Sequence, residues 1–364
     1  MIVVYCINSL HLPGGMERVL STKVNWLAQQ RGYTIHIAMR NESQSPFFPL
    51  DSRVICHNLH AKSNKEHRKL LDALLTEVKP TITITMCGPE LAFLYKINDG
   101  SKKIAEFHFT KYYLTYLVNG IEKLPLRPLH LLKAWYYQKR EERFASKYEN
   151  VVLLTKQDLN IWKNPSNMCY IHNPISFRSD IVSSLENKQI MAVGRFIAQK
   201  GFLLLLDAFS MISSKFYDWK LLIYGEGQDY NRLKDKIKKY HLEDQVSLLP
   251  PSQNIKKCFL NSSIFVFPSI YEGFGLVLTE AMECGLPCVA FDCECGPREI
   301  INDGENGFLV RNKNVSELAE KMSILISDER LRKFMGKNAK KCVSKFYPEN
   351  IMPKWIDLFQ KVAK

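Results

Sequence analysis

The chain has 364 residues, of which 46% are hydrophobic, and its formal net charge is +13. This length exceeds the roughly 250–300 residues that one hydrophobic core usually serves, so two domains are expected. The hydrophobic fraction excludes a largely disordered chain, and no apolar run reaches the roughly 18–20 residues that span a bilayer. The positive charge indicates an anionic partner: a membrane surface, a phosphorylated substrate or a nucleic acid.

The first half of the chain alternates predicted strands with predicted helices. The N-terminus has no basic leader region, so residues 2–8 are predicted to be a strand rather than a signal peptide, and we expect a cytoplasmic protein. Gly14 and Gly15 precede an amphipathic helix at 17–30. The remaining elements predicted in this half are strands at 34–39, 81–85, 103–107 and 151–155 and a helix at 70–78. Such alternation predicts a parallel sheet.

Cations and aromatic side chains are interleaved over the stretch 111–147. They are Lys111, Lys123, Arg127, Lys133, Lys139, Arg140, Arg143 and Lys147, with Tyr112, Tyr113, Tyr116, Trp135, Tyr136 and Tyr137. This combination suits an anionic membrane surface, near which each Lys or Arg adds on the order of 1 kcal/mol. The alternative is an ordinary basic helix that packs its aromatic side chains inward.

A second strand–helix series follows a polar, Ser-rich stretch at 174–188, which is the candidate linker. Its elements are strands at 190–193, 220–224, 246–249 and 264–267 and helices at 202–213 and 230–240. We therefore predict domains at 1–175 and 176–347 and a last helix at 348–364. Two doubly wound sheets of this kind are expected to meet at a central cleft, because ligands bind beyond the carboxyl ends of the strands.

The most informative stretch follows the strand at 264–267. Glu272, Gly273 and Gly275 form a turn before a predicted helix, and Glu280 lies in that helix. The first N–H groups of a helix have no internal partner and carry partial positive charge, so a phosphate can approach them where glycines remove the side chains. Glu280 could accept hydrogen bonds from ribose hydroxyls, and Glu272 could contact a second sugar. The fragment thus provides for the parts of a nucleotide-sugar, although an acidic residue at a helix start can also act only as a stabiliser.

Five short motifs occur along the chain in a fixed order. They are Gly14-Gly15-Met16-Glu17-Arg18, Val193-Gly194-Arg195 with Lys200-Gly201, Tyr224-Gly225-Glu226-Gly227, EGFGLVLTE from Glu272 to Glu280, and Asn306-Gly307-Phe308-Leu309-Val310. Together they resemble the retaining family-4 glycosyltransferases, in which they correspond to the GG-x-E loop, the G-R-x4-K-G phosphate clamp, the G-x-G turn, the E-x7-E motif and the N-G-x-L-V segment. The resemblance covers nearly the whole chain. It implies the GT-B fold, an α/β architecture of two Rossmann-like, doubly wound domains.

The resemblance also implies roles for individual residues. Those expected to be catalytic are Glu272, Arg195, Lys200 and His108, and those expected to bind the donor are Gly14, Gly15, Gly194, Gly225, Gly227, Phe274, Gly275, Leu276 and Glu280. Two cations could offset the charge that develops on a departing nucleoside diphosphate, so no cofactor and no divalent metal are expected. Without the resemblance, the cations could be solvated loop residues, the glycine pair an ordinary turn and His108 a structural residue.

The ten cysteines are expected to be reduced thiols. Four of them cluster in sequence, at Cys284, Cys288, Cys293 and Cys295. Their spacing is not the paired C-x2-C pattern of metal sites, and two of them fall at buried helix or strand positions, so packed thiols are favoured over a metal site.

The resemblance implies an enzyme of the capsule, O-antigen or exopolysaccharide type. It would transfer a sugar from a nucleotide-sugar, a UDP-hexose or UDP-N-acetylhexosamine, to a hydroxyl of a growing, lipid-linked surface glycan. The segment 296–301, GPREII, resembles galactose- and N-acetylhexosamine-transferring members. The first domain would bind the acceptor and the second the donor, and the last helix would cross back to the first domain.

Within this reading, the enzyme would lie at the inner face of the membrane, bound through 111–147. A GDP-mannose-dependent mannosyltransferase and a non-hydrolysing sugar-nucleotide epimerase stay open. No nucleic-acid-binding module is found, so no nucleic-acid partner is expected. A dehydrogenase is poorly supported, because no G-x-G-x-x-G follows the first strand.

Overall fold

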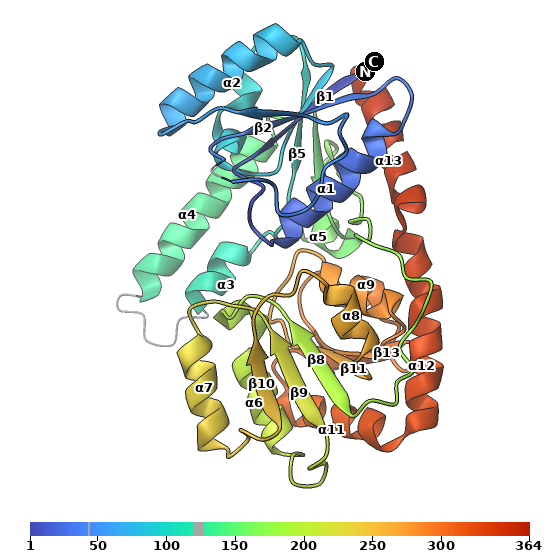
Figure 1. Ribbon diagram of the computed structural model, residues 1–364. Coiled ribbons are helices and arrows are strands. Elements are labelled where there is room, and N and C mark those ends of the chain that lie inside the picture. The colour runs from blue at the N-terminus through green and yellow to red at the C-terminus, as the bar shows by residue number, and fades with distance from the viewer. Residues whose placement is uncertain (43, 120–126) are drawn as a thin grey trace. The chain divides into compact units, whose positions relative to one another are not determined.

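The computed structural model describes residues 1–42, 44–119 and 127–364, and they divide into two compact units (Figure 1). Unit 1 comprises Met1–Leu114, Leu126–Ser176 and Phe346–Lys364, and unit 2 comprises Thr115–Pro125 and Phe177–Lys345. Each unit has a parallel sheet and a hydrophobic core of its own.

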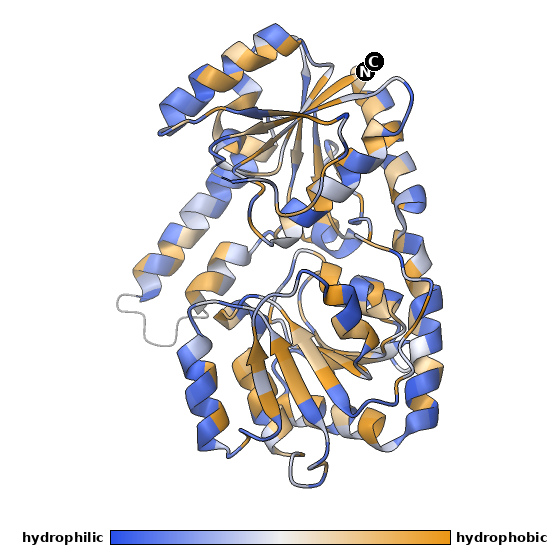
Figure 2. Ribbon diagram, in the orientation of Figure 1, coloured by the Kyte–Doolittle hydropathy of each residue, from blue (hydrophilic) through white to orange (hydrophobic). Residues whose placement is uncertain are grey.

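The sheet of unit 1 has seven parallel strands in the order β3-β2-β1-β4-β5-β6-β7. They are β1 (Ile2–Ile7), β2 (Thr34–Met39), β3 (Ile55–Asn58), β4 (Ile82–Thr85), β5 (Lys102–Glu106), β6 (Asn150–Leu153) and β7 (Met168–Tyr170). The central strands β1 and β4 are buried along almost their whole length, and β1 is a continuous hydrophobic run (Figure 2), as expected where helices cover both faces of a parallel sheet. The strand order reverses between β1 and β4, which places the topological switch point beyond their carboxyl ends.

Among the described residues, five α-helices lie between the strands of this sheet in the sequence, and a sixth lies at the end of the chain. They are α1 (Gly15–Ala28), α2 (Asn64–Val78), α3 (Tyr113–Asn119), α4 (Arg127–Ala145), α5 (Lys156–Ile161) and, at the end of the chain, α13 (Pro348–Ala363). Two short 3₁₀ turns, η1 (Pro89–Ala92) and η2 (Leu94–Lys96), lie between β4 and β5. The last helix belongs to unit 1, where α13 lies beside α1 (Figure 1).

The sheet of unit 2 has six parallel strands in the order β10-β9-β8-β11-β12-β13. They are β8 (Gln189–Val193), β9 (Lys220–Tyr224), β10 (Val246–Leu249), β11 (Ile264–Phe267), β12 (Cys288–Asp292) and β13 (Gly307–Arg311). The helices are α6 (Phe202–Ser210), α7 (Tyr230–Lys239), α8 (Ile255–Leu260), α9 (Leu276–Glu283), α10 (Pro297–Ile300), α11 (Val315–Ser327) and α12 (Glu329–Cys342), with 3₁₀ turns η3 (Ala198–Lys200) and η4 (Val343–Phe346). The switch point lies between β8 and β11.

The predicted strands at 34–39, 220–224, 246–249 and 264–267 are confirmed with the same bounds. The predicted start of the helix at 70–78 is wrong, because α2 begins at Asn64. The Ser63 side chain accepts a hydrogen bond from the Glu66 N–H, and the Glu66 carboxylate accepts one from the Lys62 N–H at 2.8 Å. These two capping contacts precede the apolar stripe of the helix, so the hydrophobic period does not reveal them.

Two strands of unit 1 were not predicted. β3 and β7 are the edge strands of the sheet, and neither contains a buried residue. Edge strands are short and lack the apolar alternation on which the prediction rests.

The predicted linker at 174–188 contains no helix or strand, but it packs against unit 2. The Ser179 N–H donates to the buried Glu283 carboxylate at 2.8 Å, and the Ser183 hydroxyl donates to the Ser262 carbonyl at 2.5 Å. The buried Arg332 guanidinium donates to the Leu185 carbonyl at 3.0 Å. From Ser179 onward the stretch is therefore an ordered part of unit 2.

Candidate functional site

The loops after β8 and β9 are packed backbone to backbone in unit 2. The Gly194 N–H donates to the Tyr224 carbonyl at 3.0 Å, and a Cβ atom on Gly225 would lie 1.9 Å from the Gly194 carbonyl oxygen. A Cβ atom on Gly227 would lie 2.5 Å from the Phe196 carbonyl oxygen. No side chain fits at either glycine, so the predicted G-x-G turn and the predicted clamp loop form one framework.

Lys200 and Glu272, both predicted to be catalytic, form an ion pair within this framework. Lys200 ends η3, and its Nζ lies 2.5 Å from Oε1 of Glu272. The stem of Lys200 passes over Gly194, because a Cβ atom there would lie 3.2 Å from the lysine Cδ. The two side chains are 16% and 11% exposed, so the pair is partly accessible to solvent. Gly201 separates Lys200 from α6, so Lys200 is not part of that helix.

Gln199, which was not predicted as a site residue, ties the clamp loop to the loop after β11. Its side-chain amide donates to the Tyr271 carbonyl at 3.0 Å, and its own carbonyl accepts from the Ile270 N–H at 2.8 Å. Burial and the neighbouring Glu272 carboxylate raise the pKa of Tyr271 to about 12, although the Arg195 guanidinium lowers it. Arg195, Gln199 and Glu272 therefore surround one short loop.

The helix that follows this loop, α9, starts as predicted at a glycine turn. Gly275 is the N-cap residue with φ 97°, a left-handed conformation that favours glycine. A Cβ atom on Gly296 would lie 1.9 Å from the Phe274 carbonyl oxygen, so the GPREII segment packs directly on the turn. Glu280 is fully buried in α9. Leu276 is only half-buried, so the prediction that it lies on the buried side of the helix is wrong.

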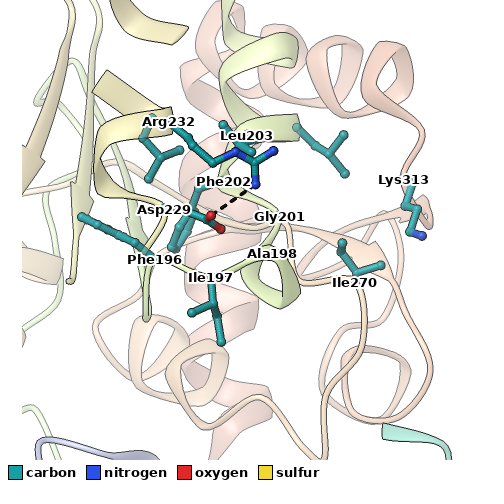
Figure 3. A pocket seen from close by; sticks show the side chains of 12 residues that line it. Phe196, Ile197, Ala198, Gly201, Phe202, Leu203, Asp229, Arg232, Ile270 and Lys313 are labelled. Atoms are coloured by element: carbon teal, nitrogen blue, oxygen red, sulfur yellow. Dashed lines mark hydrogen bonds and ion pairs between the residues drawn. The ribbon is translucent and has the colours of Figure 1, made fainter. Parts of the chain in front are cut away.

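A separate pocket of about 210 Å³ lies beside the clamp loop (Figure 3). Its lining includes Ile197, Phe202 and Leu203, and Arg232 pairs with Asp229 at 3.2 Å on its wall. None of the predicted site residues lines it. Its volume is below the roughly 300–1,000 Å³ of typical ligand pockets, so it is not the candidate donor site.

In unit 1, the predicted residues lie beyond the carboxyl ends of two strands. Gly14 and Gly15 follow β1, and His108 follows β5, with β4 between those strands in the sheet. Gly14 is the N-cap of α1, and a Cβ atom on it would lie 2.1 Å from Oε2 of Glu17. The Glu17 carboxylate thus folds back over the helix start, where the helix dipole favours negative charge.

A buried ion pair that was not predicted lies next to His108. Nζ of Lys23 in α1 lies 2.5 Å from Oε2 of Glu106 in β5. The other carboxylate oxygen of Glu106, Oε1, lies 3.4 Å from Nε2 of His108. Two sequence signals could have revealed the pair. Lys23 interrupts the apolar face that Val24 and Leu27 continue. Glu106 lies directly after the apolar pair Ile104 and Ala105 and before Phe107.

The clustered cysteines are packed thiols. Cys284, Cys288, Cys293 and Cys295 are all buried. Burial raises the pKa of Cys284 to about 12 and raises that of Cys288 further, which disfavours the thiolate that binds metals. Across the described ranges, no group of three or more His, Cys, Asp or Glu residues has the geometry of a metal site.

The predicted membrane-binding stretch contains α4, which exposes large apolar side chains. Leu129, Leu132, Trp135 and Tyr136 are 58%, 62%, 57% and 59% exposed. At 100° per residue they share one side of the helix with the cations Lys133, Lys139, Arg140 and Arg143. Figure 2 shows both hydrophobic and hydrophilic residues along α4. Lys123 lies outside the described residues, and within them no helix is both long and apolar enough to cross a membrane.

Residues 176–342 match the family Glycosyl transferases group 1. The matched residues lie almost entirely in unit 2. The amylovoran biosynthesis glycosyltransferase AmsD of Erwinia amylovora is similar to the whole chain, with 29% identity over 364 residues and 97% of each chain covered.

Two solved structures are similar to this chain in fold. A variant of TarM from S. aureus, in complex with fondaparinux, α-GlcNAc-glycerol and UDP, has a TM-score of 0.69 and 26% identity, over 80% of this chain and 59% of that longer one. Sucrose-phosphate synthase from Thermosynechococcus elongatus has a TM-score of 0.81 and 17% identity, over 99% of this chain and 98% of the other. These likenesses confirm the predicted GT-B fold of two Rossmann-like domains.

Proposed function

We propose that the protein is a retaining glycosyltransferase that transfers a sugar from a UDP-sugar to a hydroxyl group of a growing, lipid-linked surface glycan. The observation that carries this proposal is the Lys200–Glu272 ion pair, which joins the glycine framework after β8 and β9 to the loop after β11. The group 1 glycosyltransferase match covers this framework. The relative AmsD is named for amylovoran biosynthesis, and the similar TarM structure contains UDP, which favours a UDP-linked donor and a polysaccharide product.

The ion pair provides one partner for each end of the donor. A diphosphate that binds at the framework competes with Glu272 for the Lys200 ammonium, because a diphosphate carries more negative charge than one carboxylate. The released Glu272 carboxylate then accepts hydrogen bonds from the sugar hydroxyls. Arg195 supplies a second cation, and the glycine turn at Gly275 lets the phosphates approach the first N–H groups of α9. We assign the ribose hydroxyls to Glu280.

The reaction exchanges one bond at the anomeric carbon for another. The bond from that carbon to the diphosphate oxygen breaks, and a bond from the acceptor oxygen forms on the same face of the sugar. The proton of the acceptor hydroxyl passes to the departing phosphate oxygen. Lys200 and Arg195 stabilise the negative charge on that leaving group, so the proposed reaction needs no divalent metal. The roles of Gly14, Gly15 and His108 stay predictions from the family resemblance.

A thermal-shift panel tests the donor assignment. UDP, GDP and NAD are each added with and without EDTA, and a ligand at 100 times its dissociation constant adds about 2.7 kcal/mol to the stability of the folded state. We expect UDP to raise the melting temperature with and without EDTA. Stabilisation by GDP alone would replace the donor with a GDP-sugar, and loss of the UDP effect in EDTA would contradict the metal-free proposal.

The stereochemistry is tested by NMR of the transfer product. With an α-linked UDP-sugar as donor, a retaining enzyme yields an α-linked product, which the anomeric proton coupling constant identifies. A β-linked product would overturn the retaining mechanism but leave the glycosyltransferase assignment in place. Isomerised donor in the absence of any acceptor would instead identify the epimerase alternative.

For the lipid-linked acceptor, we propose that the exposed face of α4 binds an anionic membrane. Its apolar side chains can enter the headgroup region while Lys139, Arg140 and Arg143 contact lipid phosphates. Of the two acidic residues of α4, Glu141 accepts from the Tyr113 hydroxyl at 3.0 Å, and Glu142 pairs with both Lys139 at 2.8 Å and Lys111 at 3.1 Å, so the two lysines more than offset its charge.

Vesicle sedimentation tests the membrane proposal. We expect binding to vesicles that contain phosphatidylglycerol, weaker binding to phosphatidylcholine vesicles, and a loss of binding in Leu132→Ser/Trp135→Ser. Tyr217→Ser is the matched control, because Tyr217 is 76% exposed on unit 2 and its removal leaves α4 intact. Equal binding to both vesicle types, or an equal loss in the control, would contradict the proposal.

A further inference from the structure

The buried charges beside His108 form a connected group within unit 1. The side chains of Lys23 and Glu106 are 0% and 1% exposed, and their ion pair joins α1 to the last residue of β5. The Lys23 ammonium also lies 3.5 Å from the centre of the Trp355 ring of α13 and 5.3 Å from that of Tyr5 in β1. Glu106 is therefore paired with a lysine of α1 whose ammonium lies close to aromatic rings of α13 and β1.

Glu106 stays ionised in this buried position. Burial alone would raise the pKa of Glu106, but the Lys23 ammonium and His108 outweigh it and lower the pKa to about 2. Burial lowers the pKa of Lys23, and the Glu106 carboxylate works against that shift. Cation–π contacts with Trp355 and Tyr5 supply further stabilisation of the ammonium. At neutral pH the group thus contains a fixed carboxylate.

The two oxygen atoms of Glu106 face different partners. Oε2 accepts the hydrogen bond from Lys23, and Oε1 faces Nε2 of His108 at 3.4 Å. An ionised carboxylate can only accept hydrogen bonds, so the histidine nitrogen that faces it carries the hydrogen. The distance exceeds that of an ideal hydrogen bond, as is common for catalytic contacts before a substrate binds.

We propose that Glu106 is a positioning residue for His108: it selects the tautomer with hydrogen on Nε2, so that Nδ1 is the ring atom available to a sugar hydroxyl. Lys23 acts one step further back, because it holds the Glu106 carboxylate ionised and in place. The other titratable groups near Glu106 are Tyr5 from β1 and Cys87 after β4. The tautomer is a property of unit 1 itself, whereas its use in catalysis rests on the proposed function.

The test replaces the buried pair without leaving one charge unpaired. Lys23→Met/Glu106→Leu removes both charges, and Lys23→Met/Glu106→Gln removes them but retains an oxygen that can accept from Nε2. Asp99→Leu/Lys103→Met is the matched control, because Lys103 of β5 forms another buried ion pair, with Asp99 just before the strand. The tautomer of His108 is read from the ring nitrogen shifts in long-range ¹H–¹⁵N NMR spectra, assigned with His108→Gln.

We expect hydrogen on Nε2 in the wild type, in the Gln variant and in the control, and a mixture of tautomers in the Leu variant. An unchanged tautomer in the folded Leu variant would overturn the proposal, as would hydrogen on Nδ1 in the wild type. If the Leu variant does not fold, the proposal is decided by the tautomer of His108 in the wild type and in the Gln variant.

The catalytic part is tested by the pH profile of kcat. A displaced catalytic group can lower the rate by up to roughly 10²-fold, so we expect the Leu variant to lose activity and change its pH profile while the control keeps both. A Leu variant with a changed tautomer but an unchanged profile would show that Glu106 does not act in catalysis. If the wild type transfers no sugar, the proposed function fails, and the tautomer result still stands on its own.

Discussion

Each unit contains a lysine–glutamate pair at the carboxyl ends of its strands, and the two pairs differ in their access to solvent. Lys200–Glu272 in unit 2 and Lys23–Glu106 in unit 1 have the same separation of 2.5 Å. The first pair is 16% and 11% exposed, whereas the second is 0% and 1% exposed. The same contact therefore serves two purposes. In the proposed function the partly exposed pair exchanges its partners for a ligand, whereas the buried pair holds its neighbours in place.

The surroundings of the pairs explain this difference. Lys200 lies on a loop whose glycines pack closely against neighbouring groups, and its pair with Glu272 stays partly exposed, so in the proposed function an incoming phosphate replaces one anion with another. Lys23 lies on the buried side of a helix, between aromatic rings and a strand end, where separation of the charges would leave both without water. The predictions below alter one pair at a time.

The largest effect is expected from breaking the buried pair. Lys23→Met leaves the Glu106 carboxylate buried and unpaired, which should lower the free energy of unfolding by about 3–5 kcal/mol. Urea unfolding followed by circular dichroism measures this. Lys23→Met/Glu106→Leu should recover most of the loss, since a well-packed apolar pair is often neutral. If the single and double variants were equally stable, the Glu106 carboxylate would not be buried and charged in the single variant.

Breaking the accessible pair should affect the reaction rather than the fold. Lys200→Ala removes a cation from the proposed leaving group and should lower kcat by about 10²–10³-fold. Its melting temperature should change little, because partly exposed ion pairs contribute only about 0–1 kcal/mol. The control is Lys188→Ala, which breaks an exposed pair with Asp218 in the same unit. Near-normal transfer by the Lys200 variant would remove Lys200 from the site.

The glycine framework that carries the accessible pair is tested by Gly225→Ala. The new Cβ atom would lie 1.9 Å from the Gly194 carbonyl oxygen, so the clamp loop has to move, at an expected cost of about 1–3 kcal/mol in stability. We also expect weaker UDP binding by calorimetry. Gly304→Ala is the control, because Gly304 has a φ of 78° but no atom within 4 Å of the new Cβ. Equal effects of both changes would show that backbone strain, not the close packing, decides the outcome.

The smallest effect is a pH dependence from the buried pair. The pKa of Glu106 is about 2 in the folded state and about 4.3 when unfolded, so its stabilising contribution is present above pH 4.3 and is lost as the pH falls toward 2. The free energy of unfolding should therefore fall less steeply over this range in Lys23→Met/Glu106→Leu than in the wild type. Urea unfolding at several pH values measures both slopes, and identical slopes would contradict the low pKa of Glu106.

Sequence patterns predicted unit 2 in more detail than unit 1. The strand at 264–267 and the glycine turn before α9 were found because apolar runs and glycines are local signals. The same reasoning missed β3 and β7, which lie at the edges of the unit 1 sheet and lack an apolar pattern. It also missed Gln199, because a side chain that joins two loops has no signature in either loop alone.

The sequence alone determined the strand–helix alternation and the residue types at the candidate site, because hydrophobic period and glycine spacing depend on near neighbours. The GT-B fold was implied by the resemblance of its motifs to a known family. Only the tertiary structure paired Lys200 with Glu272, 72 positions apart, and Lys23 with Glu106, 83 positions apart. Which charges meet, and whether water reaches them, depends on how strands and helices distant in sequence pack together. That packing makes one lysine–glutamate pair accessible to a ligand and the other a buried support.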